Sequence, residues 1–62
     1  MSKEYIEVED AKLKHGHTRA DLFLIDGRDV WIPRSLMEPH NFAVGEVGSI
    51  YVQEWFCNQE GL

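Results

Sequence analysis

Apolar and polar residues alternate in four short stretches of this chain, with the period of a β-strand that buries one face. The stretches lie at residues 5–9, 18–25, 29–33 and 49–52. In the second stretch, Leu22 and Leu24 face one way while Phe23 and Ile25 face the other, so this strand is expected to be covered on both sides. The pattern predicts a small antiparallel sheet with residues 18–25 as its central strand.

The segments between these stretches carry the residues that turns require. Residues 10–17 are polar and contain two histidines around Gly16, which predicts a wide hairpin turn at that glycine. Asp26-Gly27 is typical of a two-residue hairpin, because glycine adopts positive φ without steric cost. Pro33 lacks a backbone donor and is expected to end the third strand. Residues 45–48 predict a tight turn before the last strand.

Two short helical segments complete the predicted fold. Ser35 and Glu38 have the spacing of a capping box, and Pro39 limits that helix to one turn. After residue 54 the strand period ends, and we expect a short helix that Gly61 terminates, with Leu62 folding back on it. The predicted fold is therefore mainly β: a small antiparallel barrel or curled sheet, SH3-like or reduced OB-like, with a short C-terminal helix.

The length of 62 residues indicates a single domain, residues 1–62, in which residues 1–4 are expected to fray. A chain of this size buries only about 60% of the surface that its unfolded form exposes. Nearly every large apolar side chain is then needed for the core, which leaves little for a reaction pocket. We therefore expect a protein that is not an enzyme, with no catalytic residues and no cofactor.

The cysteine and histidine content disfavours a disulfide or a metal site. Cys57 is the single cysteine, and after Trp55 and Phe56 it is expected to behave as a small apolar side chain. His15, His17 and His40 lack a third ligand at a recognisable metal-site spacing, so no metal is expected. The chain also has no secretory signal and no apolar run near the roughly 20 residues of a membrane span. These features favour a reduced, cytoplasmic location.

Charge is unevenly distributed along the chain. Six Lys and Arg residues against eleven Asp and Glu residues give a formal net charge of −5, which disfavours a general nucleic-acid or membrane binder. The segment 12–19 is the exception, because it has no acidic residue and contains Lys12, Lys14 and Arg19. We expect this basic hairpin to contact an acidic partner or a phosphate group.

Trp31 lies on the face opposite Val30 and Ile32, and two arrangements are open for it. In one, it packs against the terminal helix near Trp55 and covers the second face of the sheet, which we favour in so small a domain. In the other, it stays exposed and anchors a partner. Arg34 has no structural role that the sequence reveals, so we expect it to act in binding.

Several motifs in residues 20–62 occur together in a fixed order. They are Ile25-Asp26-Gly27, Val30 to Ser35 (VWIPRS), Gly45 to Ile50 (GEVGSI), Glu54-Trp55-Phe56 and Gly61-Leu62. In this combination the chain resembles a family of small uncharacterised domains of bacteriophages and mobile elements. The resemblance implies an accessory role beside nucleic-acid-handling proteins. The family's spacer is usually longer and more acidic than residues 37–40 of this chain.

The leading hypothesis is a non-catalytic protein-interaction module of phage or mobile-element type. It would bind or modulate a nucleic-acid-handling or host defence enzyme through Trp31, Arg34 and the basic hairpin with Lys12, Lys14 and Arg19. In another version of this hypothesis, the protein instead inhibits such an enzyme by presenting DNA-like carboxylates (Glu4, Glu7, Glu9 and Asp10). The alternative is direct single-strand nucleic-acid binding, in which Trp31 and Tyr51 stack on bases. A homodimer is expected if the two sheet faces cannot both be covered.

Overall fold

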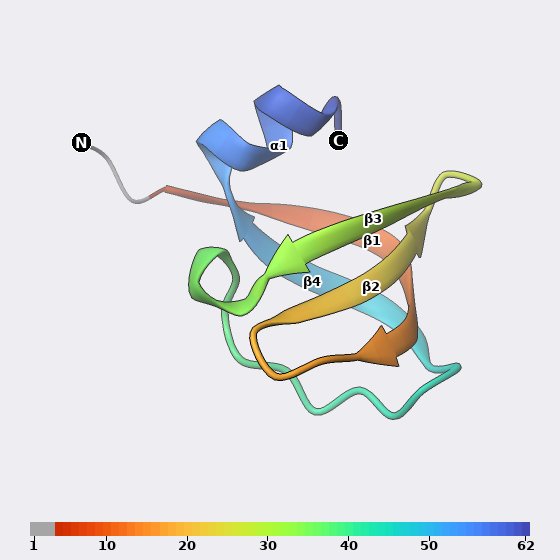
Figure 1. Cartoon of the computed structure of the whole chain (residues 1–62). Helices are drawn as coiled ribbons and strands as arrows, with labels where there is room; N and C mark the ends of the chain where they lie inside the picture. The colour runs from red at the N-terminus through yellow and green to blue at the C-terminus, as the bar shows by residue number, and fades with distance from the viewer. Residues whose placement is uncertain (1–3) are drawn as a thin grey trace.

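The structure, a computed structural model, describes residues 4–62 and contains one four-stranded antiparallel sheet (Figure 1). The strands are β1 (Tyr5–Gly16), β2 (Ala20–Ile25), β3 (Arg28–Pro33) and β4 (Val47–Gln53), in the order β3-β2-β1-β4. A 3-10 turn, η1 (Arg34–Leu36), follows β3, and one helix, α1 (Glu54–Glu60), follows β4. The prediction of a mainly β fold with a short C-terminal helix is confirmed. The sheet is not closed, because β3 and β4 are both edge strands.

β1 is one long strand, and it shows that the turn predicted at residues 10–17 is wrong in extent. The strand continues through most of this segment, with Ala11 and Leu13 buried. Its pairing with β4 shifts by one residue between Val8 and Ala11, and its pairing with β2 shifts by one between Leu13 and His15. Such bulges bend a strand and increase its twist. β1 therefore pairs with β4 along its first part and with β2 along its last part.

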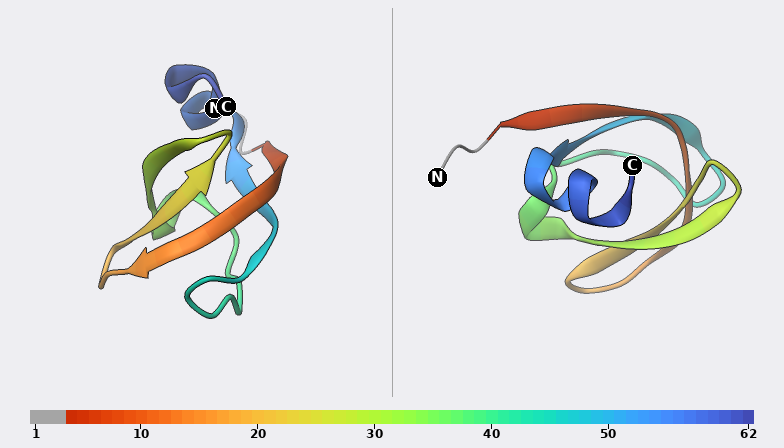
Figure 2. Two further views of the ribbon diagram at one scale, coloured as in Figure 1. Left: turned by 90° about the vertical axis from the view of Figure 1, so that its right-hand side faces the viewer. Right: turned by 90° about the horizontal axis from the view of Figure 1, so that it is seen from above.

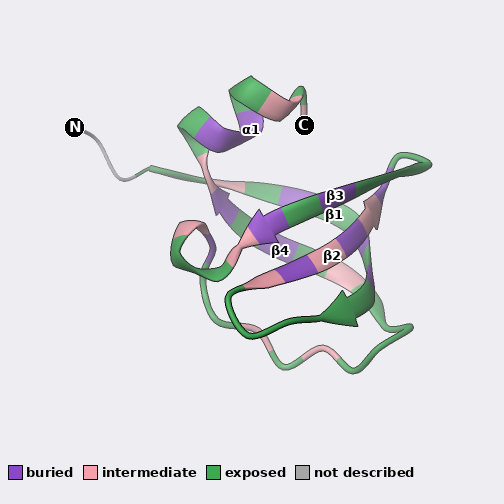
Figure 3. Ribbon diagram, in the orientation of Figure 1, coloured by how far each residue is buried: buried purple, intermediate pink, exposed green. Residues whose placement is uncertain are grey.

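The sheet curls around one apolar core. Buried and exposed residues alternate along the strands (Figure 3). Seen from above, α1 lies over the opening of the curled sheet (Figure 2), where Phe56 and Cys57 are buried. The core residues are Val8, Ala11, Leu13, Phe23, Ile25, Val30, Ile32, Met37, Ile50, Val52, Phe56 and Cys57.

One of the two hairpins forms at the predicted glycine, whereas the other turns after Gly16, within residues predicted to begin the next strand. Asp26 and Gly27 have φ angles of 51° and 79°, the paired positive values of a tight hairpin turn, and this prediction is confirmed. The other hairpin turns at residues 17–19, just after Gly16, and the His17 N–H donates to the Ala20 carbonyl at 2.9 Å. Both turns join β2 to its neighbours, so β2 is flanked on each side by a strand adjacent in sequence.

The C-terminal helix ends as the sequence predicts. Gly61 adopts the left-handed conformation with φ 74°, and the Leu62 N–H donates to the Cys57 carbonyl at 2.8 Å, which is the hydrogen bond of a Schellman cap. The Arg28 guanidinium donates to the Glu60 carbonyl. The start of β3 is thereby tied to the end of α1, where unpaired carbonyls attract a cation.

The capping box predicted at Ser35 and Glu38 does not form. η1 follows Pro33 without a side-chain cap and ends at residue 36, so Glu38 lies beyond the helix and cannot serve as its third residue. Instead, Met37 pairs with Val52, and the Glu38 N–H donates to the Tyr51 carbonyl at 2.9 Å. The limit of one helical turn is confirmed, and the chain then crosses to β4.

Residues 38–46 form a loop at the end of the sheet opposite α1 (Figure 1). The loop is fixed to β1, because the Gly45 N–H donates to the Leu13 carbonyl at 2.7 Å and the Leu13 N–H donates to the Glu46 carbonyl at 3.0 Å. Its tight turn precedes Val47, slightly earlier than predicted. The Phe42 ring lies against Gly48, where an added Cβ would meet the ring at 2.9 Å.

The fraying predicted for residues 1–4 falls mostly outside the described residues, since residues 1–3 are not described. Glu4 is described, and its carbonyl accepts a hydrogen bond of 2.8 Å from the Glu54 N–H. This bond fastens the start of β1 to the start of α1.

Candidate functional site

Two surfaces of the protein combine exposed or polar groups in a way that packing does not require. The first is the outer side of β1, β2 and β3, which we call the Trp31 face; it consists of His15, His17, Leu22, Leu24 and Trp31. The second is a pocket around Asp21, at the end of the sheet opposite α1.

The Trp31 face is built by strand register. His15 is opposite Leu22, and Leu22 is opposite Trp31, so the three residues form one row across the sheet. The Trp31 ring is 50% exposed. The rings of His15 and His17 meet it edge-on, with centroids 6.2 and 6.5 Å from that of Trp31. The result is an exposed aromatic side chain held between two imidazoles.

Of the two alternatives for Trp31, the structure shows the exposed side chain, and its role as an anchor stays a prediction. The favoured one, in which Trp31 packs against the terminal helix, is wrong. The helix covers the end of the curled sheet and buries Phe56 and Cys57 instead, while Trp55 stays 46% exposed and donates to the Gln53 side chain at 2.8 Å. From the sequence, the helix is expected to cover the second face of the sheet, but it lies over the end of the curled sheet and leaves the outer face uncovered.

The three predicted basic residues lie near the Trp31 face but differ in their partners. Lys14 forms an ion pair with Asp29 at 2.9 Å, so much of its charge is balanced within the protein. Lys12 is exposed on β1, opposite Leu24 of β2, which in turn is opposite Asp29 of β3. Arg19 is exposed in the hairpin turn. Within residues 4–62, neither Lys12 nor Arg19 forms an ion pair.

Arg34 has the structural role that sequence reasoning did not find. Its Nε and Nη2 atoms both donate to Asp21 Oδ1, at 3.2 and 2.9 Å. Its side chain is 53% exposed, whereas that of Asp21 is 2% exposed. Arg34 therefore pairs a buried carboxylate, which by itself would carry a large desolvation cost, and the view that it serves binding alone is corrected.

His40 completes this cluster from the loop after η1. Its Nε2 lies 2.8 Å from Asp21 Oδ2, and its Nδ1 accepts a hydrogen bond of 3.1 Å from the Phe42 N–H. Because a donor faces Nδ1, that nitrogen holds a lone pair and the ring proton is on Nε2. His40 is thus a neutral imidazole that donates to Asp21.

Sequence reasoning missed Asp21 and His40 as members of one cluster. Asp21 faces the core in the same row as Gly16 and Ile32, an unusual place for a carboxylate. The available signal was its position between Ala20 and Leu22 in an otherwise apolar strand, since a charge in such a place needs a partner.

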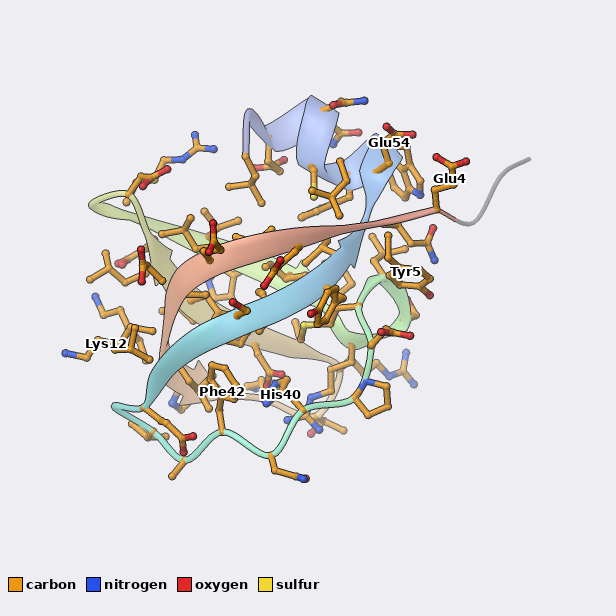
Figure 4. The ribbon with its side chains drawn as sticks, turned by 180° about the vertical axis from the view of Figure 1, so that it is seen from behind. Glu4, Tyr5, Lys12, His40, Phe42 and Glu54 are labelled. Carbon is orange, nitrogen blue, oxygen red and sulfur yellow. The ribbon has the colours of Figure 1, made fainter. Side chains whose placement is uncertain are left out.

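A pocket of about 470 Å³ opens beside this cluster. Asp21, Arg34, Glu38 and His40 are its polar side chains, and Leu13, Met37, Phe42 and Val44 supply apolar walls. Figure 4 shows His40 and Phe42 at the loop end of the molecule, with Glu4 and Glu54 at the opposite end. The volume lies within the range of small-ligand sites, about 300–1,000 Å³.

Cys57 and the histidines show no arrangement for metal or thiol chemistry in the described residues. No group of three His, Cys, Asp or Glu side chains there is placed to hold a metal ion. Cys57 is fully buried and lies 3.8 Å from the Val52 carbonyl. Burial, with a smaller contribution from the charge of Glu54, raises the pKa of the Cys57 thiol above its ordinary value, which favours the unreactive thiol form.

The comparisons with known proteins do not assign this chain. It matches no protein-family model, no curated protein and no solved structure. No helix within residues 4–62 has the length and apolar character that crossing a bilayer requires.

Proposed function

We propose that the protein is a non-catalytic interaction module that binds a protein partner through the Trp31 face. The observation that carries the proposal is the half-exposed indole of Trp31, flanked by two imidazoles and by Leu22 and Leu24, which are half-buried. A tryptophan in such a position is a typical anchor of a protein interface. We further propose that the curled sheet is an open form of an SH3-like or OB-like barrel.

The charges near this face define the chemistry of the partner. Lys12 and Arg19 are exposed cations without internal partners in the described part of the chain. Their positive potential favours a partner with an acidic surface beside an apolar side chain that fits against Trp31. The resemblance to phage and mobile-element domains is the reason to seek this partner among nucleic-acid-handling or host defence enzymes.

The polar cluster supports a non-catalytic role. Both oxygens of Asp21 and both ring nitrogens of His40 already have partners inside the protein. A general base needs a free lone pair that faces a substrate, and in His40 that lone pair accepts the Phe42 N–H. The cluster therefore supports the fold.

The test compares two tryptophans of nearly equal exposure. The wild type, Trp31→Ala and Trp55→Ala are each immobilised and exposed to a lysate of the source cells, and the captured proteins are identified by mass spectrometry. Recovered candidates are then titrated as pure proteins. We expect Trp31→Ala and Lys12→Glu/Arg19→Glu to weaken the pure complex at least tenfold, and Trp55→Ala to leave it unchanged. Equal affinity of Trp31→Ala and the wild type would refute the proposal.

Single-strand nucleic-acid binding is a second candidate, because an exposed indole near Lys12 and Arg19 also suits base stacking and phosphate contact. It is tested by titrating a dT oligonucleotide at low and high salt and following tryptophan fluorescence. Quenching that is lost in Trp31→Ala and weakens steeply with salt favours this candidate.

A third candidate is that a second copy of the chain covers the Trp31 face. Concentration-dependent dimerisation that Trp31→Ala abolishes would identify this homodimer.

A further inference from the structure

The pocket beside Asp21 contains one strong donor that the fold does not use. Arg34 reaches Asp21 with Nε and Nη2, whereas its Nη1 makes no hydrogen bond within residues 4–62. The neighbouring walls, formed by Leu13, Met37 and Val44, are apolar. Val44 is 67% exposed at this site, so an apolar side chain of the protein itself borders the opening.

The charges that line the pocket disfavour an anionic ligand. The opposite charges of Arg34 and Asp21 are paired at 2.9 Å. His40 is neutral, because the Phe42 N–H occupies its Nδ1. Glu38, which is exposed and also lines the pocket, adds a negative charge. A ligand suited to this pocket has an apolar body and an uncharged oxygen that accepts from Arg34 Nη1.

We infer that the pocket receives an apolar side chain of a peptide segment, whose adjoining backbone carbonyl accepts a hydrogen bond from Arg34 Nη1. A peptide carbonyl is the commonest uncharged acceptor in proteins. Arg34, which lines the pocket, also donates its backbone N–H to the Arg19 carbonyl at 2.9 Å, so this side of the pocket is tied to the hairpin that carries the exposed Arg19. The inference rests on the proposed function in one respect: the segment belongs to the same protein partner.

Small peptide mimics separate this pocket from the Trp31 face. The probe is N-acetyl-leucinamide, added at millimolar concentration to the whole chain and followed through backbone amide shifts in heteronuclear NMR. We expect saturable shifts at Gly16, Met37 and Val44. N-acetylglycinamide, which lacks the apolar side chain, is expected to give no saturable shift. N-acetyl-leucine, which carries a carboxylate, is expected to bind several-fold more weakly.

Variants test the contacts separately from folding. Val44→Asp places a charge at the opening, while Val47→Asp changes another exposed valine that does not line the pocket. We expect the first to abolish the leucinamide shifts and the second to keep them. Arg34→Lys retains a cation for Asp21 but removes the Nη1 donor, and it is expected to weaken binding several-fold.

Each result supports or overturns the inference. Absence of saturable shifts in the folded wild type would overturn it, and so would tighter binding of N-acetyl-leucine than of the amide. Trp31→Ala is expected to lose the protein partner while keeping the leucinamide shifts. If the shifts are absent but the partner still depends on Trp31, the pocket inference fails and the proposed function stands.

Discussion

The Nε2 atom of His40 donates to the Oδ2 atom of Asp21 across 2.8 Å, joining a loop to the one buried carboxylate among the described residues. The two residues are 19 positions apart in the sequence. Asp21 lies at the end of the core, and His40 lies in the loop that leads back to β4. This hydrogen bond, together with Arg34, satisfies both oxygens of a carboxylate that would otherwise be costly to bury.

We expect Asp21→Ala to destabilise the protein by about 3 kcal/mol, because it leaves His40 and Arg34 without their acceptor and opens a cavity. Asp21→Asn keeps only one acceptor oxygen and turns the other into an NH2 donor that faces either Arg34 or His40, so it is expected to recover only a small part of that loss. Urea unfolding followed by circular dichroism measures both. Equal stability of Asp21→Ala and the wild type would show that the cluster does not stabilise the fold.

The tautomer of His40 is a separate prediction. ¹⁵N-edited NMR of the imidazole rings is expected to show the proton of His40 on Nε2, protected from exchange, with an unprotonated Nδ1. His15 and His17 are exposed and serve as internal controls with rapid exchange. A proton on Nδ1 of neutral His40 would contradict the hydrogen bond from Phe42.

The order of strands and turns was predictable because short-range signals specify it. Asp26-Gly27 requires positive φ at two successive residues, and this alone defines the β2–β3 hairpin. Gly61 followed by Leu62 defines the end of α1 in the same local way. The extent of β1 was not predictable from alternation, because the bulges at residues 8–11 and 13–15 each shift the alternation by one position. Without a continuous alternation, residues 10–17 resemble a turn.

The candidate site was predictable only in its exposed part. Trp31 and the basic residues of the hairpin follow from composition and strand period, although their exposure depends on curling of the sheet. The Asp21 cluster depends on tertiary structure, since His40 reaches Asp21 only after the chain crosses beneath the sheet. No spacing rule in the sequence links a strand carboxylate to a histidine in a loop.

Gly48 permits the loop to pack against β4. A Cβ there would lie 2.9 Å from Cζ of Phe42, closer than packed atoms approach, so the ring must move. We expect Gly48→Ala to destabilise the protein by about 1–3 kcal/mol, and the double variant with Phe42→Leu to recover part of that loss. Ser49→Ala, at the exposed neighbour, is expected to change stability by less than about 0.5 kcal/mol. Thermal unfolding compares the variants, and an unchanged Gly48→Ala would contradict this packing.

Trp31→Ala is expected to leave the fold largely intact. The indole is half exposed and contacts the edges of His15 and His17, so its cross-strand contacts are worth about 1 kcal/mol. Ile32→Ala, next to it on the buried side, is expected to cost about 2–5 kcal/mol. Urea unfolding of the two variants measures the difference. A loss from Trp31→Ala as large as that from Ile32→Ala would mean that the indole serves the core and not an interface.

The buried thiol of Cys57 makes stability depend on pH in the alkaline range. Its pKa in the folded protein is raised above the ordinary thiol value of 9.0, mainly by burial. Above that value the unfolded chain loses the proton while the folded protein keeps it, so the unfolded state binds fewer protons and stability falls as pH rises. The contribution is fully present below about pH 9 and is lost as pH approaches the folded pKa.

Cys57→Ser provides the comparison, because its hydroxyl does not titrate in this range while every other ionisable group is retained. We expect the free energy of unfolding of the wild type to decline more steeply than that of Cys57→Ser as the pH rises above about 9. The difference between the two profiles isolates the thiol from the tyrosines and lysines that titrate nearby. Parallel profiles would mean that the thiol ionises as easily in the folded protein as in the unfolded chain, which is incompatible with its burial on the inner side of α1.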